Sequence, residues 1–176
     1  AGCRGGGLAK GAAGRPVFGL IGSGTGAFGG MGIVARCCTA VVMSEEGRRS
    51  LSGPEVIETV RGVEEFDSRD RALVWRVTGG KHRYLIGDAV QLVPDRIDAF
   101  AEAALSLIDA HTETEDPLQA LENAHAQLGA RLQAYGGCRD GLEVWTLQGI
   151  ADAEQLPLLD TADFLDAVKD RSLPWN

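Results

Sequence analysis

The sequence predicts an α/β protein, with a small parallel sheet followed by a helical C-terminal region. Two observations predict this fold. Two short apolar runs, residues 16–22 and 39–43, flank an apolar stretch of helical length. After Leu92 the composition changes to alanine-, leucine- and acid-rich segments, with apolar residues three or four apart. Short buried strands joined through a helix pair in parallel with a right-handed crossover.

Size and charge exclude several classes of function. The chain has 176 residues, enough for one domain with its own core, and 44% of them are hydrophobic. The net charge is −8 and no run of lysine or arginine occurs, so nucleic acid is not an expected partner. No apolar stretch is long enough for a membrane span, and the first residues lack a signal-peptide core. The expected location is the cytoplasm.

The first third predicts a strand–helix–strand unit. Residues 16–22 form a buried strand, and the flexible turn at 23–26 follows it. Residues 30–38 are apolar on nearly all sides apart from Arg36, which predicts a largely buried helix. Residues 39–43 are apolar and rich in valine, so they predict the second strand.

The rest of the chain is predicted to be mostly helical. Gly53-Pro54-Glu55 is a helix-start signal, residues 67–77 predict another helix that ends at residues 78–80, and residues 89–93 predict a short strand. Three further helices are expected after Pro94, at Asp116-Pro117 and at Asp160.

Apolar stripes on these three helices are expected to face the core or a subunit interface, and that of the third helix consists of Phe164, Leu165 and Val168. The stripes of the first two helices are longer. Their members are Ile97, Phe100, Ala101, Ala104, Leu105 and Ile108, then Leu118, Leu121, Leu128, Leu132 and Tyr135.

The glycine-rich turn at residues 27–32 is the first candidate site. Gly29 and Gly30 stand where a buried helix begins, so their N–H groups are expected to be unpaired and unshielded. Such donors, helped by the helix dipole, would hold the oxygen of a thioester carbonyl as it becomes an enolate. Close packing of helix on strand would explain the same glycines. A nucleotide site at residues 22–26 is disfavoured, because neither phosphate-loop pattern is complete.

The cysteines give no metal motif. Cys3, Cys37, Cys38 and Cys138 form no CxxC pair, and no histidine stands at ligand spacing from them. Buried free thiols are the expected state, and no bound metal is predicted.

Several segments together resemble the crotonase superfamily. They are Pro-Val-x-x-x-Ile-Gly from Pro16, Phe-Gly-Gly-Met-Gly from Phe28, Thr-Ala-Val-Val-Met from Thr39 and Leu-x-Gly-Pro-Glu from Leu51. The stretch from Ser52 to Tyr84 is similar to the β subunit of malonate decarboxylases, and the likeness extends from about Leu8 to Val93. The resemblance implies a crotonase-like (ClpP/crotonase) ββα core, partial, over residues 1–93, and a helical region of the same domain over residues 94–176.

The resemblance also implies an activity and partners. A malonate decarboxylase subunit of this kind acts on a malonyl thioester, carried by a CoA-like prosthetic group on an acyl carrier protein, and gives acetyl thioester through an enolate. A γ-type subunit would complete the heterodimer, and no cofactor would be bound by this chain itself. In the alternative activity, a carboxyltransferase, the carboxyl group passes to biotin on another chain or to an acyl-CoA. A non-catalytic scaffold is the third hypothesis.

The family pattern implies site residues around the turn. Gly30 matches the oxyanion donor at the helix start, with Gly29 beside it, and Glu55 matches an acid used for proton transfer by hydratases. The second hydratase acid falls on Ile33, which argues against hydration. Phe28 and Met31 are predicted to contact the substrate.

A second group of candidates follows the glycine pair at residues 79–80. His82 would protonate the enolate, or would bind the carrier's phosphate with Lys81 and Arg83, and Tyr84 is a possible donor. A structural histidine and a core tyrosine are the alternatives. Because the family core is longer before the position of Leu8, the chain is predicted to be N-terminally truncated, with the other oxyanion donor elsewhere.

Overall fold

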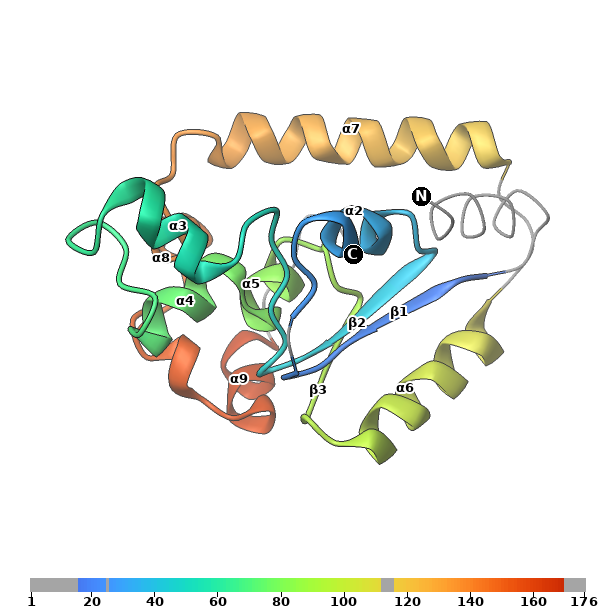
Figure 1. Cartoon of the computed structure of the whole chain (residues 1–176). Helices are drawn as coiled ribbons and strands as arrows, with labels where there is room; N and C mark the ends of the chain where they lie inside the picture. The colour runs from blue at the N-terminus through green and yellow to red at the C-terminus, as the bar shows by residue number, and fades with distance from the viewer. Residues whose placement is uncertain (1–15, 25, 112–115, 170–176) are drawn as a thin grey trace.

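The computed structural model describes residues 16–24, 26–111 and 116–169, which fold around a three-stranded parallel sheet (Figure 1). The strands are β1 Phe18–Ile21, β2 Ala40–Ser44 and β3 Gln91–Val93, in the order β1-β2-β3. Phe18 pairs with Ala40, and Val42 pairs with Gln91, both in parallel. The predicted strands and their parallel direction are therefore confirmed.

Both faces of β2 are buried, as the unbroken apolar run of this strand predicts. Val41 and Met43 point to one face, where they pack with Ile21 and Ala35. Val42 points to the other face and packs beneath α6 Ile97–Ala110. Side chains alternate along a strand, so one short run serves two core layers.

The helices of the described residues are α2 Gly30–Arg36, α3 Pro54–Arg61, α4 Arg71–Thr78, α5 Gly80–Leu85, α6, α7 Pro117–Tyr135, α8 Gly141–Leu147 and α9 Thr161–Val168, with a 3₁₀ turn at Leu156–Leu158. Side chains cap three of the predicted helices: Asp70 accepts from Leu73, Asp116 from Leu118, and Asp160 from the Asp163 N–H. The cap residues predicted at Asp116 and Asp160 are therefore confirmed.

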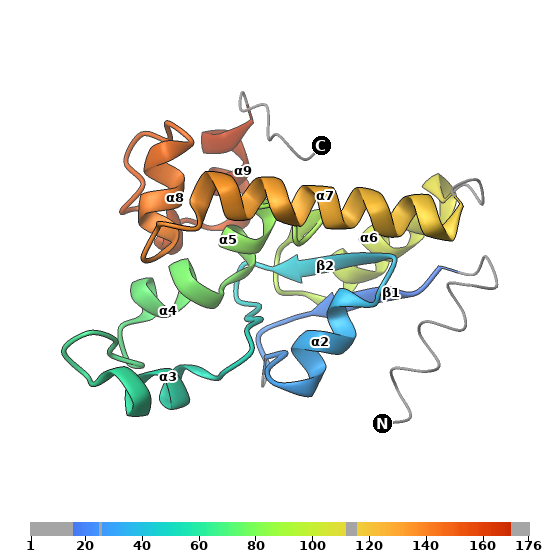
Figure 2. The ribbon, with the colours of Figure 1, turned by 90° about the horizontal axis from the view of Figure 1, so that it is seen from above.

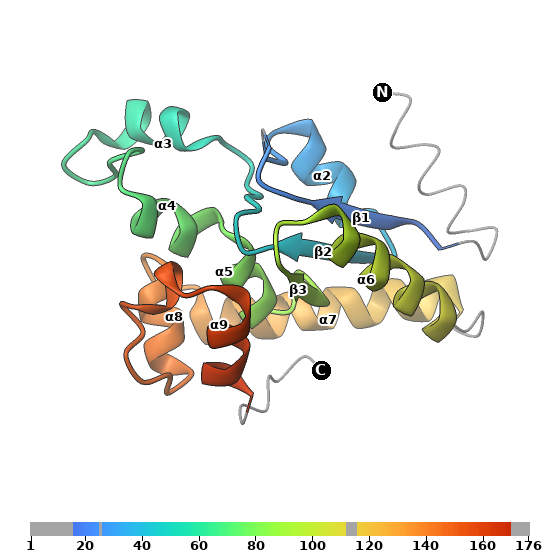
Figure 3. The same ribbon diagram turned by 90° about the horizontal axis from the view of Figure 1, so that it is seen from below.

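Helices cover the sheet on two sides. Figure 2 shows α7 lying lengthwise over the strands, with α2 on the same side. Figure 3, from below, shows α6 in front of the sheet and α7 behind it. The helices α4, α5, α8 and α9 gather at one end. In the described residues no helix is long and apolar enough to cross a membrane.

A second hydrophobic core joins the part of the chain up to β3 to the C-terminal helices α8 and α9. Trp145 and Phe164, from α8 and α9, are fully buried with Leu85 and Leu92 from the first part. Neither α5 nor α8 is predictable from the sequence, because six or seven residues carry too little periodicity to identify a helix.

Two burial predictions are wrong. The helix α2 is not largely buried: Gly32 and Ala35 are buried against their neighbours, while Met31 is 58% exposed and Ile33 39% exposed. The strand β1 is also less buried than predicted, since Leu20 is 49% exposed. For the later stripes, the core is the correct alternative on α9, where Phe164 and Val168 are buried, but on α6 the small Ala99 and Ala103 are the buried residues. Large stripe residues instead face outward, namely Ile97, Leu105, Ile108, Leu118, Leu121, Leu128 and Leu132. Their role at a subunit interface stays a prediction.

Candidate functional site

The glycine-rich turn is held against the segment at residues 48–51. The Ala27 N–H donates to the Arg48 carbonyl at 2.8 Å, and the Ser50 N–H donates back to the Ala27 carbonyl at 3.3 Å. Ala27 and Arg49 form a parallel bridge. The turn therefore has a fixed position just beyond the carboxyl end of β1, where ligands bind in open parallel sheets.

The two predicted donors differ in this structure. The Gly29 N–H already donates a 2.9 Å hydrogen bond to the Leu51 carbonyl, which corrects the expectation that both groups are unpaired. The Gly30 N–H makes no hydrogen bond to another of the described residues. A side chain added at Gly30 would meet open space. Gly30 is therefore the donor that can reach a ligand.

Gly29 and Gly32 make this geometry possible. Gly29 has φ 56° and ψ −125°, a conformation that residues with side chains rarely adopt. A Cβ on Gly32 would lie 2.7 Å from the Ser50 carbonyl oxygen, so only glycine lets α2 approach the segment at residues 48–51. The sequence predicts no role for Gly32 in particular, and close packing of α2 against its neighbours explains this glycine.

Phe28 and Glu55 converge on Gly53, at the start of α3. A Cβ built on Gly53 would lie 3.8 Å from the Phe28 ring and 3.5 Å from the Glu55 carboxylate. Glu55 is exposed, in the first turn of α3. The structure thus brings Phe28, Gly29, Gly30 and Glu55 to the region where the glycine turn meets the start of α3. Met31, which directly follows Gly30, is exposed.

Lys81 lies apart from this turn and is buried. Its ammonium group donates to the Leu159 carbonyl and, at 2.8 Å, to the Pro157 carbonyl. Burial lowers the pKa of Lys81, against the attraction of Glu45. These contacts favour a structural role over the predicted phosphate contact.

Arg83 supports the clamp behind the turn. Its Nε donates to the Arg49 carbonyl at 3.2 Å, and its guanidinium pairs with Asp88 at 3.3 Å. The Arg49 N–H in turn donates to the Thr78 carbonyl at 2.8 Å. Arg83 therefore contacts the segment that holds the glycine turn, and these bonds also favour a structural role.

His82 and Tyr84 face the C-terminal helices. The His82 ring lies 6.0 Å from the Trp145 ring, and its buried Nδ1 has no hydrogen-bond partner among the described residues. Burial, with repulsion from Arg83, lowers the pKa of His82 to about 3, so the ring is neutral near pH 7. Tyr84 packs edge-on against Phe164, as a core tyrosine would.

The cysteines are partly buried rather than buried. Cys37, Cys38 and Cys138 are free thiols of intermediate exposure, and Cys3 lies outside the described residues. Burial and the neighbouring Cys37 raise the pKa of Cys38, which makes its thiolate less available. In residues 16–24, 26–111 and 116–169, no three His, Cys, Asp or Glu side chains group as metal ligands.

Comparison with known proteins finds this α/β chain similar in sequence to a carboxyltransferase and in fold to malonate decarboxylase chains. It is 39% identical over 158 residues to a malonyl-S-ACP:biotin-protein carboxyltransferase of Malonomonas rubra. That match covers 88% of this chain, so the likeness extends well past Val93, where the sequence analysis expected it to fade. No family model matches the chain.

Two solved structures of malonate decarboxylases have folds similar to that of this chain. A Pseudomonas malonate decarboxylase hetero-tetramer in complex with malonate matches 80% of this chain with a TM-score of 0.64 and 30% identity. A Pseudomonas MdcD-MdcE hetero-dimer matches 69% of this chain with a TM-score of 0.52 and 27% identity. The chain spans about half the length of the relatives it matches, 50% of the Malonomonas protein and 50% and 49% of the two solved chains.

Proposed function

We propose that this chain is part of a malonate decarboxylase subunit with a crotonase-like core, which acts on a malonyl thioester. The similarity to the Malonomonas and Pseudomonas proteins supports the substrate class. The Gly30 N–H, which has no hydrogen-bond partner among the described residues although its turn is clamped, is the observation that carries the mechanism.

The proposed reaction begins with cleavage of the bond between the substrate's methylene carbon and its carboxylate. The electron pair moves into the thioester as an enolate, and carbon dioxide leaves. A Gly30 N–H directed at the enolate oxygen would stabilise the charge that develops in the transition state. A proton then returns to the carbon and gives the acetyl thioester.

Glu55 is the proposed proton donor of this chain. Its carboxyl group is exposed, so it would take up a proton from water and pass it to the enolate carbon, and it lies beside Gly53 and Phe28, close to the turn. His82 is less suited, because its ring contacts α8 rather than the glycine turn. The expected effect of Glu55→Gln is a lower rate of acetyl thioester formation.

Transfer of the carboxyl group to biotin is the second candidate function. The name of the Malonomonas relative, a malonyl-S-ACP:biotin-protein carboxyltransferase, favours it. Both reactions pass through the same enolate, so Gly30 would serve either. Biotin would be carried on another protein, and the malonyl group on an acyl carrier protein.

A second subunit is the proposed partner, and the cytoplasm the proposed location. The solved neighbours are hetero-dimers or hetero-tetramers. Apolar side chains beside the turn are exposed in this chain, namely Met31, Ile33, Leu51 and Val56. A γ-type subunit that packs here would bury them and shield the enolate from water.

Gly30→Pro tests the function, because proline removes the proposed N–H but fits sterically at the first position of a helix. We expect carbon dioxide release from malonyl-carrier thioester, with the γ-type subunit present, to fall by about two to three orders of magnitude. Ile97→Pro is the matched control, since Ile97 begins α6 and is 89% exposed.

The outcomes separate the hypotheses. An unchanged rate in folded Gly30→Pro protein would remove Gly30 from the mechanism. Turnover only with a biotin acceptor would select the carboxyltransferase. An intact heterodimer that catalyses neither reaction would support the third hypothesis, a non-catalytic scaffold.

A further inference from the structure

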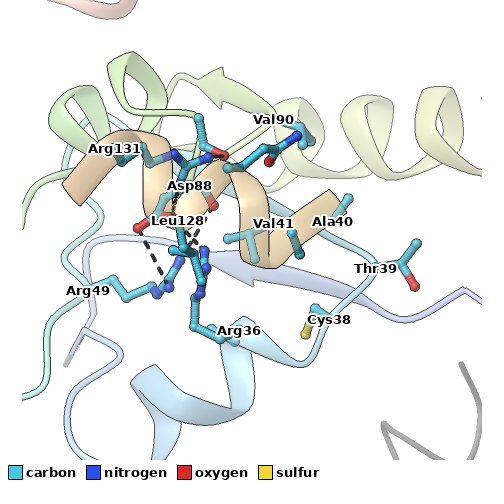
Figure 4. Close-up of a pocket in the computed structure, with 14 residues that line it drawn as sticks. Arg36, Cys38, Thr39, Ala40, Val41, Arg49, Asp88, Val90, Leu128 and Arg131 are labelled. Atoms are coloured by element: carbon cyan, nitrogen blue, oxygen red, sulfur yellow. Dashed lines mark hydrogen bonds and ion pairs between the residues drawn. The ribbon is translucent and has the colours of Figure 1, made fainter. Parts of the chain in front are cut away.

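A pocket rich in arginine lies at the other end of α2 from the glycine turn (Figure 4). It has a volume of about 180 Å³ and is lined by Arg36, Arg49, Asp88 and Arg131, and by Thr39 and other residues near the start of β2. The glycine turn follows the carboxyl end of β1, whereas this pocket lies at the amino end of β2. The two sites therefore lie at opposite ends of the strands, with Arg49 between them, since it bridges Ala27 at the turn and also lines the pocket.

Positive charge exceeds negative charge at this pocket. The Asp88 carboxylate forms ion pairs with Arg36 at 2.6 Å, Arg131 at 2.8 Å, Arg83 at 3.3 Å and Arg49 at 3.8 Å. One carboxylate thus faces four guanidinium groups. Figure 4 shows Arg36 from α2 and Arg131 from α7 directed at Asp88 from opposite sides.

The excess charge is poorly solvated. The side chains of Arg49 and Asp88 are only 6% and 9% exposed. Burial, with repulsion from Arg83 and Arg36, lowers the pKa of the Arg49 guanidinium, against the attraction of Asp88. Like charges held together away from water repel each other strongly, and a bound anion would offset that repulsion.

Arg36 has donors left for such an anion. A guanidinium carries five N–H donors, and within the described part of the chain that of Arg36 makes one hydrogen bond, to Asp88. Its side chain is 38% exposed, so a ligand can reach it. The pocket is smaller than the roughly 300 Å³ of sites that enclose whole drug-sized ligands, so it suits a small ionic group.

We propose that this pocket binds a phosphate dianion, either free or as the end group of a phosphate ester, between Arg36 and its neighbouring arginines. Planar guanidinium groups bind phosphate oxygens in pairs, with two parallel hydrogen bonds. A dianion also balances the charge better than a monovalent ion would. The binding site is independent of the proposed decarboxylation.

Titration calorimetry on the full chain, at constant ionic strength, tests the proposal. Inorganic phosphate and phenyl phosphate are the probes, and sodium nitrate is the monovalent control. We expect saturable one-site binding of phosphate and no saturable binding of nitrate. Tighter binding of phenyl phosphate identifies the end group of an ester as the ligand, and tighter binding of inorganic phosphate identifies the free ion. Absence of saturable binding by both phosphates overturns the proposal.

Arg36→Gln locates the site. We expect phosphate to bind about tenfold more weakly, the effect of one lost charge-assisted hydrogen bond. Arg96→Gln is the matched control, because Arg96 is exposed and paired with Asp98 at the start of α6, and it should bind as the unaltered chain does. If Arg36→Gln changes stability but not phosphate affinity, the arginines only hold Asp88 and the proposal is wrong.

Discussion

The backbone N–H of Gly29 donates a 2.9 Å hydrogen bond to the carbonyl of Leu51, which joins the glycine turn to the segment before α3. This bond uses one of the two donors that the sequence offered and leaves Gly30 as the other. It also requires the unusual backbone conformation of Gly29, with φ 56°. The turn is therefore a rigid structure with one available donor.

Gly29→Ala should destabilise the protein by about 1–3 kcal/mol, the usual cost of holding a residue with a Cβ in such a conformation. A Cβ at Gly29 would meet no other atom within 4 Å, so the loss would come from backbone strain rather than from a clash. Urea unfolding measures it. Gly30→Ala is the control, with equally open space and no positive φ, and should leave stability within about 1 kcal/mol. Equal stability of the two variants would contradict the assignment of strain to Gly29.

Lys81→Met should destabilise the fold by about 1–3 kcal/mol, because the carbonyls of Pro157 and Leu159 would lose their donor. Chemical denaturation of the two proteins gives the difference. Lys169→Met, at an exposed lysine paired with Asp166, should change stability by less than about 0.5 kcal/mol. If Lys81→Met instead weakens binding of the acyl carrier protein without a loss of stability, the predicted contact of Lys81 with the carrier's phosphate is correct.

His82 should make the fold less stable in mild acid. The folded pKa of about 3 lies below the ordinary 6.5, so between these values the unfolded chain takes up a proton that the folded chain does not. Stability is then independent of His82 above pH 6.5 and falls by up to about 1.4 kcal/mol per pH unit below it.

Unfolding free energies at pH 5, 6 and 7 test this dependence. His82→Gln should have a shallower slope between these values, whatever its absolute stability. His125→Gln is the control, since His125 is exposed on α7. If the unaltered protein and both variants have the same dependence of unfolding free energy on pH, His82 takes up its proton equally in the folded and the unfolded chain. The lowered pKa of His82 would then be wrong.

Ile33→Asp should weaken binding of the γ-type subunit by at least about tenfold, because it places a charge in the proposed apolar interface. Ile33 is already 39% exposed, so the chain should still fold. Affinity measured with the purified partner tests the effect. Leu147→Asp, at the end of α8 and 66% exposed, should bind normally, and equal weakening in both variants would refute this interface.

Local sequence determined most of the elements. Short apolar runs specified β1 and β2 as parallel strands, although only β2 is buried along most of its length. Asp116 and Asp160 marked helix starts, because capping acts within a few residues. The family resemblance, which the comparisons support, located the glycine turn. Glycines alone could not distinguish an oxyanion donor from close packing, and the structure shows one of each in Gly30 and Gly32.

Tertiary structure decided the roles of the remaining side chains. The sequence put Lys81, His82, Arg83 and Tyr84 in one predicted site, but α5 turns them toward different neighbours, since successive helical residues point about 100° apart. Likewise Asp88 and its four arginines come from separate elements, so no local pattern could reveal their cluster. Sequence fixes which groups a segment offers, while long-range packing determines which of them meet and which remain unpaired.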